Sequence, residues 1–303
     1  MKYTFGPIAS RRFGLSLGID VSPNKKQCNF DCLYCELEGS KTTNSFDDDT
    51  DFMEIINQVK SELELNPNIE VITVTSNGEP TLYPYLDRLI DELNDIKEDK
   101  QTLILTNSSL IGNDDIQKTL SKFDIVKLSL DCISKECFKK LDRNHTDIKI
   151  ENIIDGLIKF SKIYDNMVLE VLFVKDINDK DSEVVRLIDT IKQINPSRVD
   201  IGTIDRPPAY DVKPVGLEFL DDIAKRFVKN KIDNISISHR DMKSAQNLSY
   251  DKEAILELLK MRPITKSDIE YLFDDKSKKL FDELLAQNKI KSRFASNSEF
   301  FTV

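Results

Sequence analysis

The residues best suited to chemistry in this chain are three cysteines on one short segment, Cys28, Cys32 and Cys35. Three residues separate the first pair and two separate the second, so three thiolates can converge on one metal centre. A closed structural zinc site needs four ligands, and an ordinary all-cysteine iron–sulfur cluster also uses four. A [4Fe–4S] cluster bound by these three cysteines would therefore keep one iron open for a chelating substrate.

Two other interpretations of the three cysteines stay open at the level of sequence. Zinc could bind them if a distant residue completed the site, but the chain has only two histidines, His145 and His239, and neither is near in sequence. The cysteines could also be unrelated core residues, because free cysteine is commonly buried.

Composition limits the class of protein. Residues 1–13 contain no apolar core of a signal peptide, and no apolar run approaches the roughly 20 residues that a membrane helix needs. We therefore expect a cytoplasmic protein without a membrane segment, in which the five cysteines are ligands or core residues rather than disulfides. Cys132 and Cys137 are not spaced for a second cluster, and we expect them to be structural.

The net charge of −10 is unevenly distributed. Residues 250–303 hold ten basic and ten acidic side chains, so the first 249 residues carry the whole excess of negative charge. Because phosphate contacts need lysine and arginine, the acidic part is poorly suited to binding nucleic acid in general.

Short β-branched runs alternate with amphipathic stretches through most of the chain, which predicts an α/β fold with a parallel sheet. Apolar stripes of helical period lie within 52–63, 86–93, 153–158 and 184–191. Six β/α units are too few for a closed eight-stranded barrel but suit an open partial (β/α)6 barrel, and a doubly wound sheet is the alternative. The six expected strands are 15–21, 71–75, 102–106, 125–130, 168–174 and 199–204.

The end of the chain has a different pattern, and we expect two domains, 1–245 and 246–303. Helices are expected over 251–261, after a cap at Thr265, and over 276–287, followed by a hairpin of 289–294 and 299–303. Three helices and a hairpin resemble a winged-helix domain, in which the third helix usually reads nucleic acid. Basic residues gather on that helix and hairpin: Lys276, Lys278, Lys279, Lys289, Lys291 and Arg293. The domain could contact RNA or another macromolecule, or it could serve only for packing or for docking a partner.

Polar residues follow several of the expected strands. The second strand is followed by Ser76-Asn77-Gly78-Glu79-Pro80, and the third by Asn107. The fourth ends in Ser129-Leu130-Asp131, and Arg143 lies a little further on. Ligands of barrel-like α/β proteins gather at the carboxyl ends of strands, so these residues and the three cysteines are expected at one site.

The cysteine segment, with Tyr34 before the last cysteine and Gly78-Glu79 after the next strand, resembles the signature of the radical S-adenosylmethionine (SAM) superfamily. The stretch of residues 3–20 and the motif of residues 205–208 resemble, more narrowly, the iron–sulfur oxidoreductase group similar to tRNA wyosine synthetases. Wyosine synthetases carry further N-terminal cysteines for a second cluster, and this chain has none before Cys28. The resemblance therefore does not extend to their pyruvate-dependent chemistry.

The resemblance implies a [4Fe–4S] cluster on the three cysteines and SAM as cofactors, with an electron donor such as flavodoxin or ferredoxin. SAM would be cleaved reductively to methionine and a 5′-deoxyadenosyl radical that removes hydrogen from a substrate, which could be RNA, a protein or a small molecule. Tyr34 would lie beside the adenine, and Glu79, with Gly78, would hold the ammonium group of SAM. The ribose hydroxyls and the carboxylate would contact the remaining candidates: Asn107, Ser129, Asp131 and Arg143. No catalytic residue is assigned.

A non-catalytic iron–sulfur protein, such as a sensor whose winged helix contacts DNA, is the alternative function. The Gly78-Glu79-Pro80 motif favours the enzyme, because a sensor or an electron carrier has no need to hold SAM.

Overall fold

The computed structural model describes residues 1–10, 12–237, 248–261, 263–295 and 298–303. Its main feature is an eight-stranded sheet in which the strands follow their order in the chain, β1 to β8. The strands are β1 (Thr4–Ser10), β2 (Gly14–Asp20), β3 (Val71–Thr75), β4 (Gln101–Thr106), β5 (Ile125–Ser129), β6 (Met167–Phe173), β7 (Arg198–Thr203) and β8 (Ile235–Ile237).

The six strands expected from the sequence are confirmed as β2 to β7, and all neighbouring pairs among them are parallel. Two strands of this sheet were missed. The edge strand β1 runs antiparallel to β2 and contains Gly6 and Pro7, with a register shift between Phe5 and Ile8. Proline and glycine argue against a strand except at an edge or a bulge, and β1 is both. The other missed strand, β8, has only three residues.

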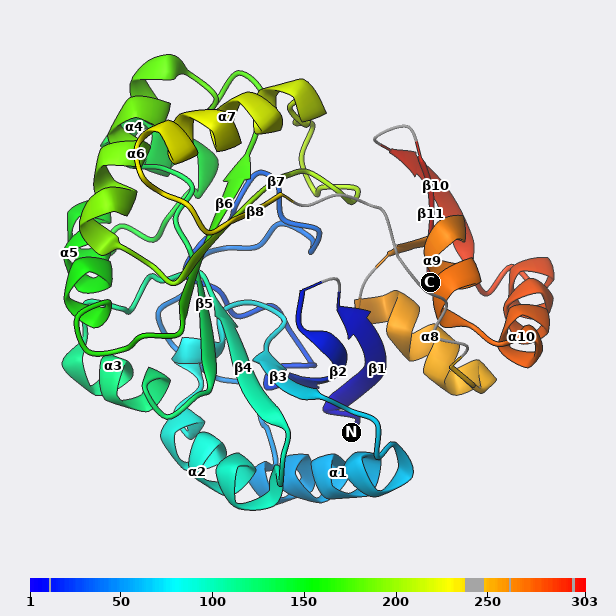
Figure 1. Ribbon diagram of the computed structural model, residues 1–303. Coiled ribbons are helices and arrows are strands. Elements are labelled where there is room, and N and C mark those ends of the chain that lie inside the picture. The colour runs from blue at the N-terminus through cyan, green and yellow to red at the C-terminus, as the bar shows by residue number, and fades with distance from the viewer. Residues whose placement is uncertain (11, 238–247, 262, 296–297) are drawn as a thin grey trace.

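Helices cover the outer face of the curved sheet, as Figure 1 shows. The four helices expected in this part are confirmed as α1 (Phe52–Leu65), α2 (Leu86–Ile96), α5 (Ile150–Phe160) and α6 (Asp181–Ile194). The first begins where the Asp51 side chain accepts hydrogen bonds from the backbone N–H groups of Met53 and Glu54. Four further elements were not expected: α3 (Asp114–Leu120), α4 (Lys135–Leu141), α7 (Leu217–Lys229) and the 3₁₀ helix η1 (Pro80–Leu82).

The strand order decides between the two architectures that the sequence left open. A doubly wound sheet reverses its strand order at a switch point. Here the order never reverses, so every crossover moves in the same direction and leaves its helix on the same face. The fold is therefore the partial parallel barrel, extended by one strand on each side.

The lumen of this partial barrel is charged near its middle, and the turn between β1 and β2 lies at the amino ends of the strands, beside a hollow of about 380 Å³. Lys127 on β5 contacts Glu170 on β6 at 2.5 Å. Arg12, in the turn between β1 and β2, reaches across to the buried Asp200 on β7 at 3.1 Å. Phe13 packs beside it against the first residues of the central strands. Ligands of barrel-like α/β proteins gather at the carboxyl ends of the strands, so the functional site is expected at the opposite end from this turn.

Residues 248–303 form a second hydrophobic core. Helices α8 (Lys252–Met261), α9 (Lys266–Leu272) and α10 (Asp275–Ala286) pack on a small sheet in the order β10 (Lys291–Ala295), β11 (Ser298–Thr302), β9 (Ile264–Thr265). Thr265 caps α9, as expected, and forms a capping box with Asp268. The three helices and the hairpin match the expected elements. The winged-helix comparison stays a prediction, and the expected boundary at 245/246 lies outside the described residues.

This C-terminal segment packs against β1 at the side of the barrel (Figure 1). Ile8 of β1 belongs to its hydrophobic core, and the Tyr250 hydroxyl donates a hydrogen bond of 2.5 Å to the carbonyl oxygen of Pro7. The edge strand is thereby covered by α8 rather than left open to pairing.

Candidate functional site

The loop that carries Cys28, Cys32 and Cys35 leaves the carboxyl end of β2 and crosses the top of the barrel. All three cysteines have free thiols; Cys28 is buried and the other two are partly buried. The loop is tied to the carboxyl end of α4 by two backbone hydrogen bonds. The Asp31 N–H donates to the Asp142 carbonyl oxygen at 3.0 Å, and the Leu33 N–H donates to the Leu141 carbonyl oxygen at 2.9 Å. It therefore has a fixed path without a disulfide.

Hydrogen-bond donors are aimed at two of the sulfurs. The N–H of Phe30 lies 3.4 Å from the Cys28 Sγ, and the Asn107 side-chain amide lies 3.6 Å from it. The Lys26 Nζ lies 3.7 Å from the Cys35 Sγ. Donors of this kind stabilise a negatively charged sulfur, and those at cluster cysteines tune iron–sulfur clusters.

Burial opposes ionisation of the same thiols when no metal is bound. Burial first, and then the nearby Glu79 carboxylate, raises the pKa of Cys28 to about 12. Burial also raises the pKa values of Cys32 and Cys35. A bound cation reverses this balance, because metal ligation deprotonates a thiol outright. The chemistry of the donor set and its surroundings thus fits a metal cluster.

The Gly78 backbone pairs directly with the start of the cysteine loop. The N–H of Gln27 donates to the Asn77 carbonyl oxygen, and the N–H of Glu79 donates to the Gln27 carbonyl oxygen, both at 2.9 Å. Gly78 has a φ of +141°, and a Cβ built on it would lie 1.9 Å from the Gln27 carbonyl oxygen. Only glycine allows this close approach, so the strand-to-loop pairing explains why glycine stands here.

The Glu79 side chain is 1% exposed and accepts four hydrogen bonds from the protein itself. Its Oε1 accepts from the Thr81 N–H and hydroxyl at 3.0 and 2.6 Å and from the Thr106 hydroxyl at 2.6 Å. Its Oε2 accepts from the Asn107 N–H at 2.7 Å. Glu79 therefore joins the ends of β3 and β4 and orients Asn107, whose amide faces Cys28.

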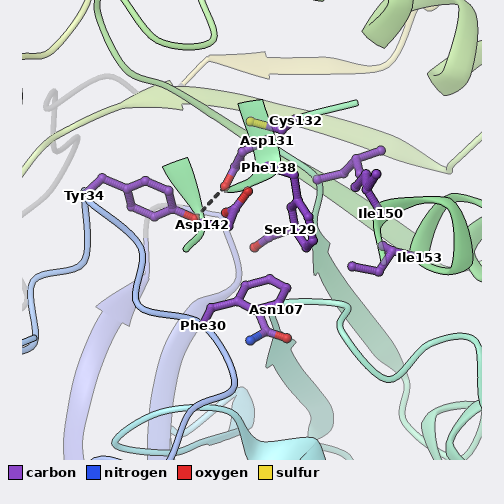
Figure 2. A pocket seen from close by; sticks show the side chains of 11 residues that line it. Phe30, Tyr34, Asn107, Ser129, Asp131, Cys132, Phe138, Asp142, Ile150 and Ile153 are labelled. Carbon is purple, nitrogen blue, oxygen red and sulfur yellow. Dashed lines mark hydrogen bonds between the residues drawn. The ribbon is translucent and has the colours of Figure 1, made fainter. Parts of the chain in front are cut away.

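Beside the cysteine loop is a pocket that brings together four of the seven residues expected to bind the cofactor: Tyr34, Asn107, Ser129 and Asp131. Figure 2 shows the Tyr34 ring pointing toward Asp131. The Tyr34 hydroxyl donates a 2.5 Å hydrogen bond to the Asp131 Oδ2. Gly78, Glu79 and Arg143 do not line this pocket.

Two buried carboxylates stand side by side in the pocket wall (Figure 2). Burial raises the pKa of Asp131 to about 7, against hydrogen bonds from the Leu172 N–H and from Tyr34. Burial, and then the charge of Asp131, raises the pKa of Asp142. Asp142 also accepts from the Cys32 thiol at 3.7 Å. The sequence did not single out Asp142, because it lies in the cap of α4 and not at a strand end.

The pocket has an apolar side that the sequence analysis also missed. Phe30 and Phe138 meet edge to face with ring centroids 5.3 Å apart, and Ile150 and Ile153 of α5 complete the wall. Phe30 lies between the first two cysteines. An aromatic residue inside the metal motif could therefore have indicated the apolar wall of the pocket.

Arg143 does not line the pocket and contacts the cysteine loop elsewhere. Its guanidinium pairs with the Asp31 carboxylate at 3.2 Å and stacks over the Tyr210 ring at 4.6 Å from the centroid. It holds the loop at the position between Cys28 and Cys32.

One expectation is wrong. Cys132 and Cys137 are buried, as expected, but they form a disulfide. Cys132 comes directly after Asp131 at the end of β5, and Cys137 lies in the first turn of α4. The chain reverses between them and brings their Cα atoms to 5.5 Å, within the range that a disulfide spans. Cys132 is also more than structural, because it lines the pocket.

The zinc interpretation finds no support at His145, whose Nδ1 lies 2.8 Å from the Asn44 side-chain amide and 3.4 Å from Asp147. His239 lies outside the described residues.

A partial barrel with a three-cysteine loop at the carboxyl ends of its strands defines a class of enzymes that use SAM for radical chemistry. The model of one family, the Radical SAM superfamily, matches residues 26–188, and the chain belongs to that superfamily. Its members use a [4Fe–4S] cluster and SAM, which are the cofactors of this chain, and they need a reductant.

Relatives match along nearly the whole chain. A Helicobacter pylori (strain ATCC 700392 / 26695) protein named UPF0026 protein is 36% identical over 98% of this chain and 96% of its own length. UPF0026 protein MJ1312 of Methanocaldococcus jannaschii is 29% identical over 89% of this chain and 88% of its own. Neither name states a reaction.

Solved structures share the fold at low identity. TYW1 with a lysine–pyruvate adduct bound has a TM-score of 0.55 and 15% identity, covering 71% of this chain and 73% of that one. Native anSMEcpe with bound AdoMet has a TM-score of 0.52 and 18% identity, covering 73% of this chain and 63% of that one. In the part of the chain that the structure describes, no helix has the length and apolar composition to cross a membrane.

Proposed function

We propose that Cys28, Cys32 and Cys35 hold a [4Fe–4S] cluster with one iron open to SAM, and that the protein is a radical SAM enzyme acting on an unidentified substrate. When bound, the cluster supplies the electron that cleaves SAM to methionine and a 5′-deoxyadenosyl radical able to remove hydrogen from that substrate.

One observation carries the proposal: the cysteine loop, the Gly78 turn and the end of β4 are joined at a single point. Gln27 pairs with the Gly78 turn, and Asn107 donates to both the Cys28 sulfur and the Asn29 side-chain oxygen, at 3.6 and 2.9 Å. The first cysteine of the loop is therefore held in place before any cofactor binds, and Phe30 and Tyr34 of the same loop line the pocket in Figure 2. Such preorganisation lowers the cost of orienting a bound cofactor.

We assign SAM to that pocket, with Tyr34, Asn107, Ser129 and Asp131 in contact with it. Tyr34 would face the adenine, and the other three would offer an amide, a hydroxyl and a carboxylate to the ribose and methionine parts. The pocket has an apolar wall and a few converging polar groups, as cofactor sites do. It encloses only about 10 Å³, so its lining must move apart to admit SAM.

In this proposal Glu79 and Arg143 position other residues of the site, whereas the sequence predicts that they contact SAM. The Glu79 oxygens already accept four hydrogen bonds, so Glu79 acts by orienting Asn107 and the Gly78 turn rather than by gripping the ammonium group itself. Arg143 acts by holding Asp31 in the cysteine loop, because its guanidinium is paired there.

The partners follow from this chemistry. We propose an electron donor such as flavodoxin or ferredoxin, and the cytoplasm as the compartment in which the three free thiols stay reduced. RNA or another macromolecular substrate would approach through the C-terminal segment, whose basic side chains include the exposed Lys279 and Lys291.

The test is anaerobic reconstitution with iron and sulfide, followed by dithionite and SAM, with 5′-deoxyadenosine quantified. We expect product from the native chain and none from Cys32→Ala, because the two remaining cysteines are too few to retain the cluster. Arg226→Gln, which removes a surface ion pair to Asp181 away from the loop, is the control and should retain iron. A bound cluster in the native chain with no SAM binding or cleavage would overturn the enzyme and favour a non-catalytic iron–sulfur protein.

A further inference from the structure

The motif Asp205-Arg206-Pro207-Pro208 has no part in the proposed chemistry, yet its segment lies against the cysteine loop. We name residues 204–216, between β7 and α7, the clamp segment. The N–H of Ala209 donates to the Cys35 carbonyl oxygen at 2.8 Å. One guanidinium nitrogen of Arg206 contacts both carboxylate oxygens of Glu36, at 3.1 and 2.9 Å. The clamp segment thus holds the last cysteine and the residue after it.

A second contact of the clamp segment holds the loop on either side of the last two cysteines. The Tyr210 hydroxyl donates to the Asp31 Oδ2 at 2.6 Å. A Cβ built on Gly39 would lie 2.2 Å from the Tyr210 hydroxyl oxygen, so glycine is required for this approach. Arg143 stacks on the same ring. The clamp segment therefore contacts the loop before Cys32 and again beyond Cys35.

The clamp segment is itself anchored to the barrel. Its Val215 N–H donates to the Thr203 hydroxyl at 2.9 Å, and Thr203 in turn donates to the Phe173 carbonyl oxygen at 2.8 Å. Pro207 and Pro208 restrict the backbone next to Arg206, which reduces the entropy lost on ordering it. Because its backbone is anchored and restricted, Arg206 can restrain the Glu36 side chain more tightly than an arginine on a flexible surface loop could.

Several carboxylates act on the charge of Arg206. Burial acts to lower the pKa of Arg206, but the charges of Glu36, Asp205 and Asp268 outweigh it and raise that pKa above its ordinary value. Asp268 is the capping-box residue at the start of α9. Arg206 is therefore within electrostatic reach of a carboxylate of the cysteine loop and of one in the C-terminal segment.

We propose that Arg206 is a positioning residue: through Glu36 it fixes the Cys35 end of the cysteine loop, and the clamp segment supplies the support. The expected effect of Arg206 on cluster retention rests on the proposed function. Its expected effect on the position of Cys35 does not. An ordinary surface ion pair contributes little to stability, so the test must measure the position of Cys35 rather than stability alone.

The first test uses the reduced apoprotein and measures alkylation of Cys35 and Cys28 by iodoacetamide with mass spectrometry. Arg206→Gln and Glu36→Gln should each speed Cys35 alkylation about five- to tenfold, and the double variant should add little, as expected for one coupled pair. Cys28 should not change. The control is Arg226→Gln, which removes another partly exposed pair, to Asp181 at 2.9 Å, away from the loop.

This design separates positioning from a purely electrostatic effect. Loss of the Arg206 cation alone would disfavour the Cys35 thiolate and slow its alkylation, while loss of the Glu36 charge would speed it. Faster Cys35 alkylation in one single variant with slower alkylation in the other would therefore overturn the proposal. Faster alkylation in both variants supports it. If Arg206→Gln fails to fold, Tyr210→Phe removes the hydroxyl that donates to Asp31 and should give a smaller increase in Cys35 alkylation.

The second readout is the rate at which a chelator removes iron from the reconstituted protein. We expect faster loss in Arg206→Gln than in Arg226→Gln, with partial recovery in Arg206→Lys. A native chain that holds no cluster, combined with the expected alkylation result, would reject the proposed function and leave the clamp standing. A native chain that cleaves SAM, with both readouts alike in Arg206→Gln and Arg226→Gln, would reject the clamp.

Discussion

Buried carboxylates at the top of the barrel differ in how their negative charge is compensated. Glu79 accepts four hydrogen bonds, whereas the Asp20 Oδ1 accepts two, from the N–H groups of Ser22 and Asn77, both at 2.9 Å. Among the described residues, the Asp20 Oδ2 has no hydrogen-bond partner. Asp20 thus joins the end of β2 to the Gly78 turn at an electrostatic cost.

That cost predicts a dependence of stability on pH. Burial raises the pKa of Asp20 from 3.8 to about 6, so the folded state binds a proton more tightly than the unfolded state. Its contribution is most favourable below pH 4, is lost as pH rises to 6, and amounts to at most about 3 kcal/mol. Asp20→Asn should remove this loss, so its free energy of unfolding should rise relative to the native chain between pH 4 and 7.

Urea unfolding at several pH values measures the difference. Asp221→Asn, at an exposed site on α7, is the charge-matched control. The same pH slope in Asp20→Asn and the native chain would show that Asp20 is not the group responsible.

At the scale of elements, the site depends on backbone pairing between two loops. The Gln27–Gly78 bridge extends the parallel pairing of β2 and β3 beyond the strand ends into the cysteine loop. This pairing transmits the geometry of the sheet to the metal ligands.

Gly78→Ala should break this pairing, because the added Cβ would lie 1.9 Å from a backbone oxygen that cannot rotate away. We expect the reconstituted variant to lose most of its iron and its SAM affinity while its far-ultraviolet circular dichroism is retained. Iron assay and equilibrium dialysis with SAM provide the measurements.

Gly216→Ala is the matched control, since a Cβ at that position meets nothing within 4 Å. Equal iron content in the two variants would mean that the cysteine loop does not need this contact.

On the scale of the whole molecule, the C-terminal segment is packed on the barrel rather than merely attached to it. Ile8 of β1 lies in the core of that segment, so removing residues after 248 would expose an apolar strand face. Charge reversal tests nucleic-acid binding without this damage.

Lys279→Glu combined with Lys291→Glu changes two exposed side chains on α10 and β10. If RNA is bound there, its affinity at low salt should fall at least about tenfold, because each lost phosphate contact weakens binding and reduces its salt dependence. Formation of 5′-deoxyadenosine should not change. Lys278 is left intact because it pairs with Glu270 at 2.8 Å. Absence of RNA binding by both proteins at low salt would reject a nucleic-acid partner at this surface.

The sequence by itself determined what is encoded locally. Apolar periodicity predicted the six central strands and four of the long helices of the barrel. It missed α3 and α4, which have only seven residues each, and also the longer α7. Strand β1 was missed because Gly6 and Pro7 both have low strand propensity. The strand forms because it pairs with β2, which no local pattern indicates. The metal motif and the strand-end residues were predictable because residue type and position carry the signal.

Tertiary structure alone decided which of these residues meet. It directed the Glu79 carboxylate inward to Thr81, Thr106 and Asn107, and it joined Cys132 to Cys137 across a reversal of the chain. It also brought Arg206 to Glu36, 170 positions away in the sequence. The physical reason is that spacing rules describe neighbours along the chain, whereas these contacts arise from strand order and loop packing, which bring together residues that no local pattern relates.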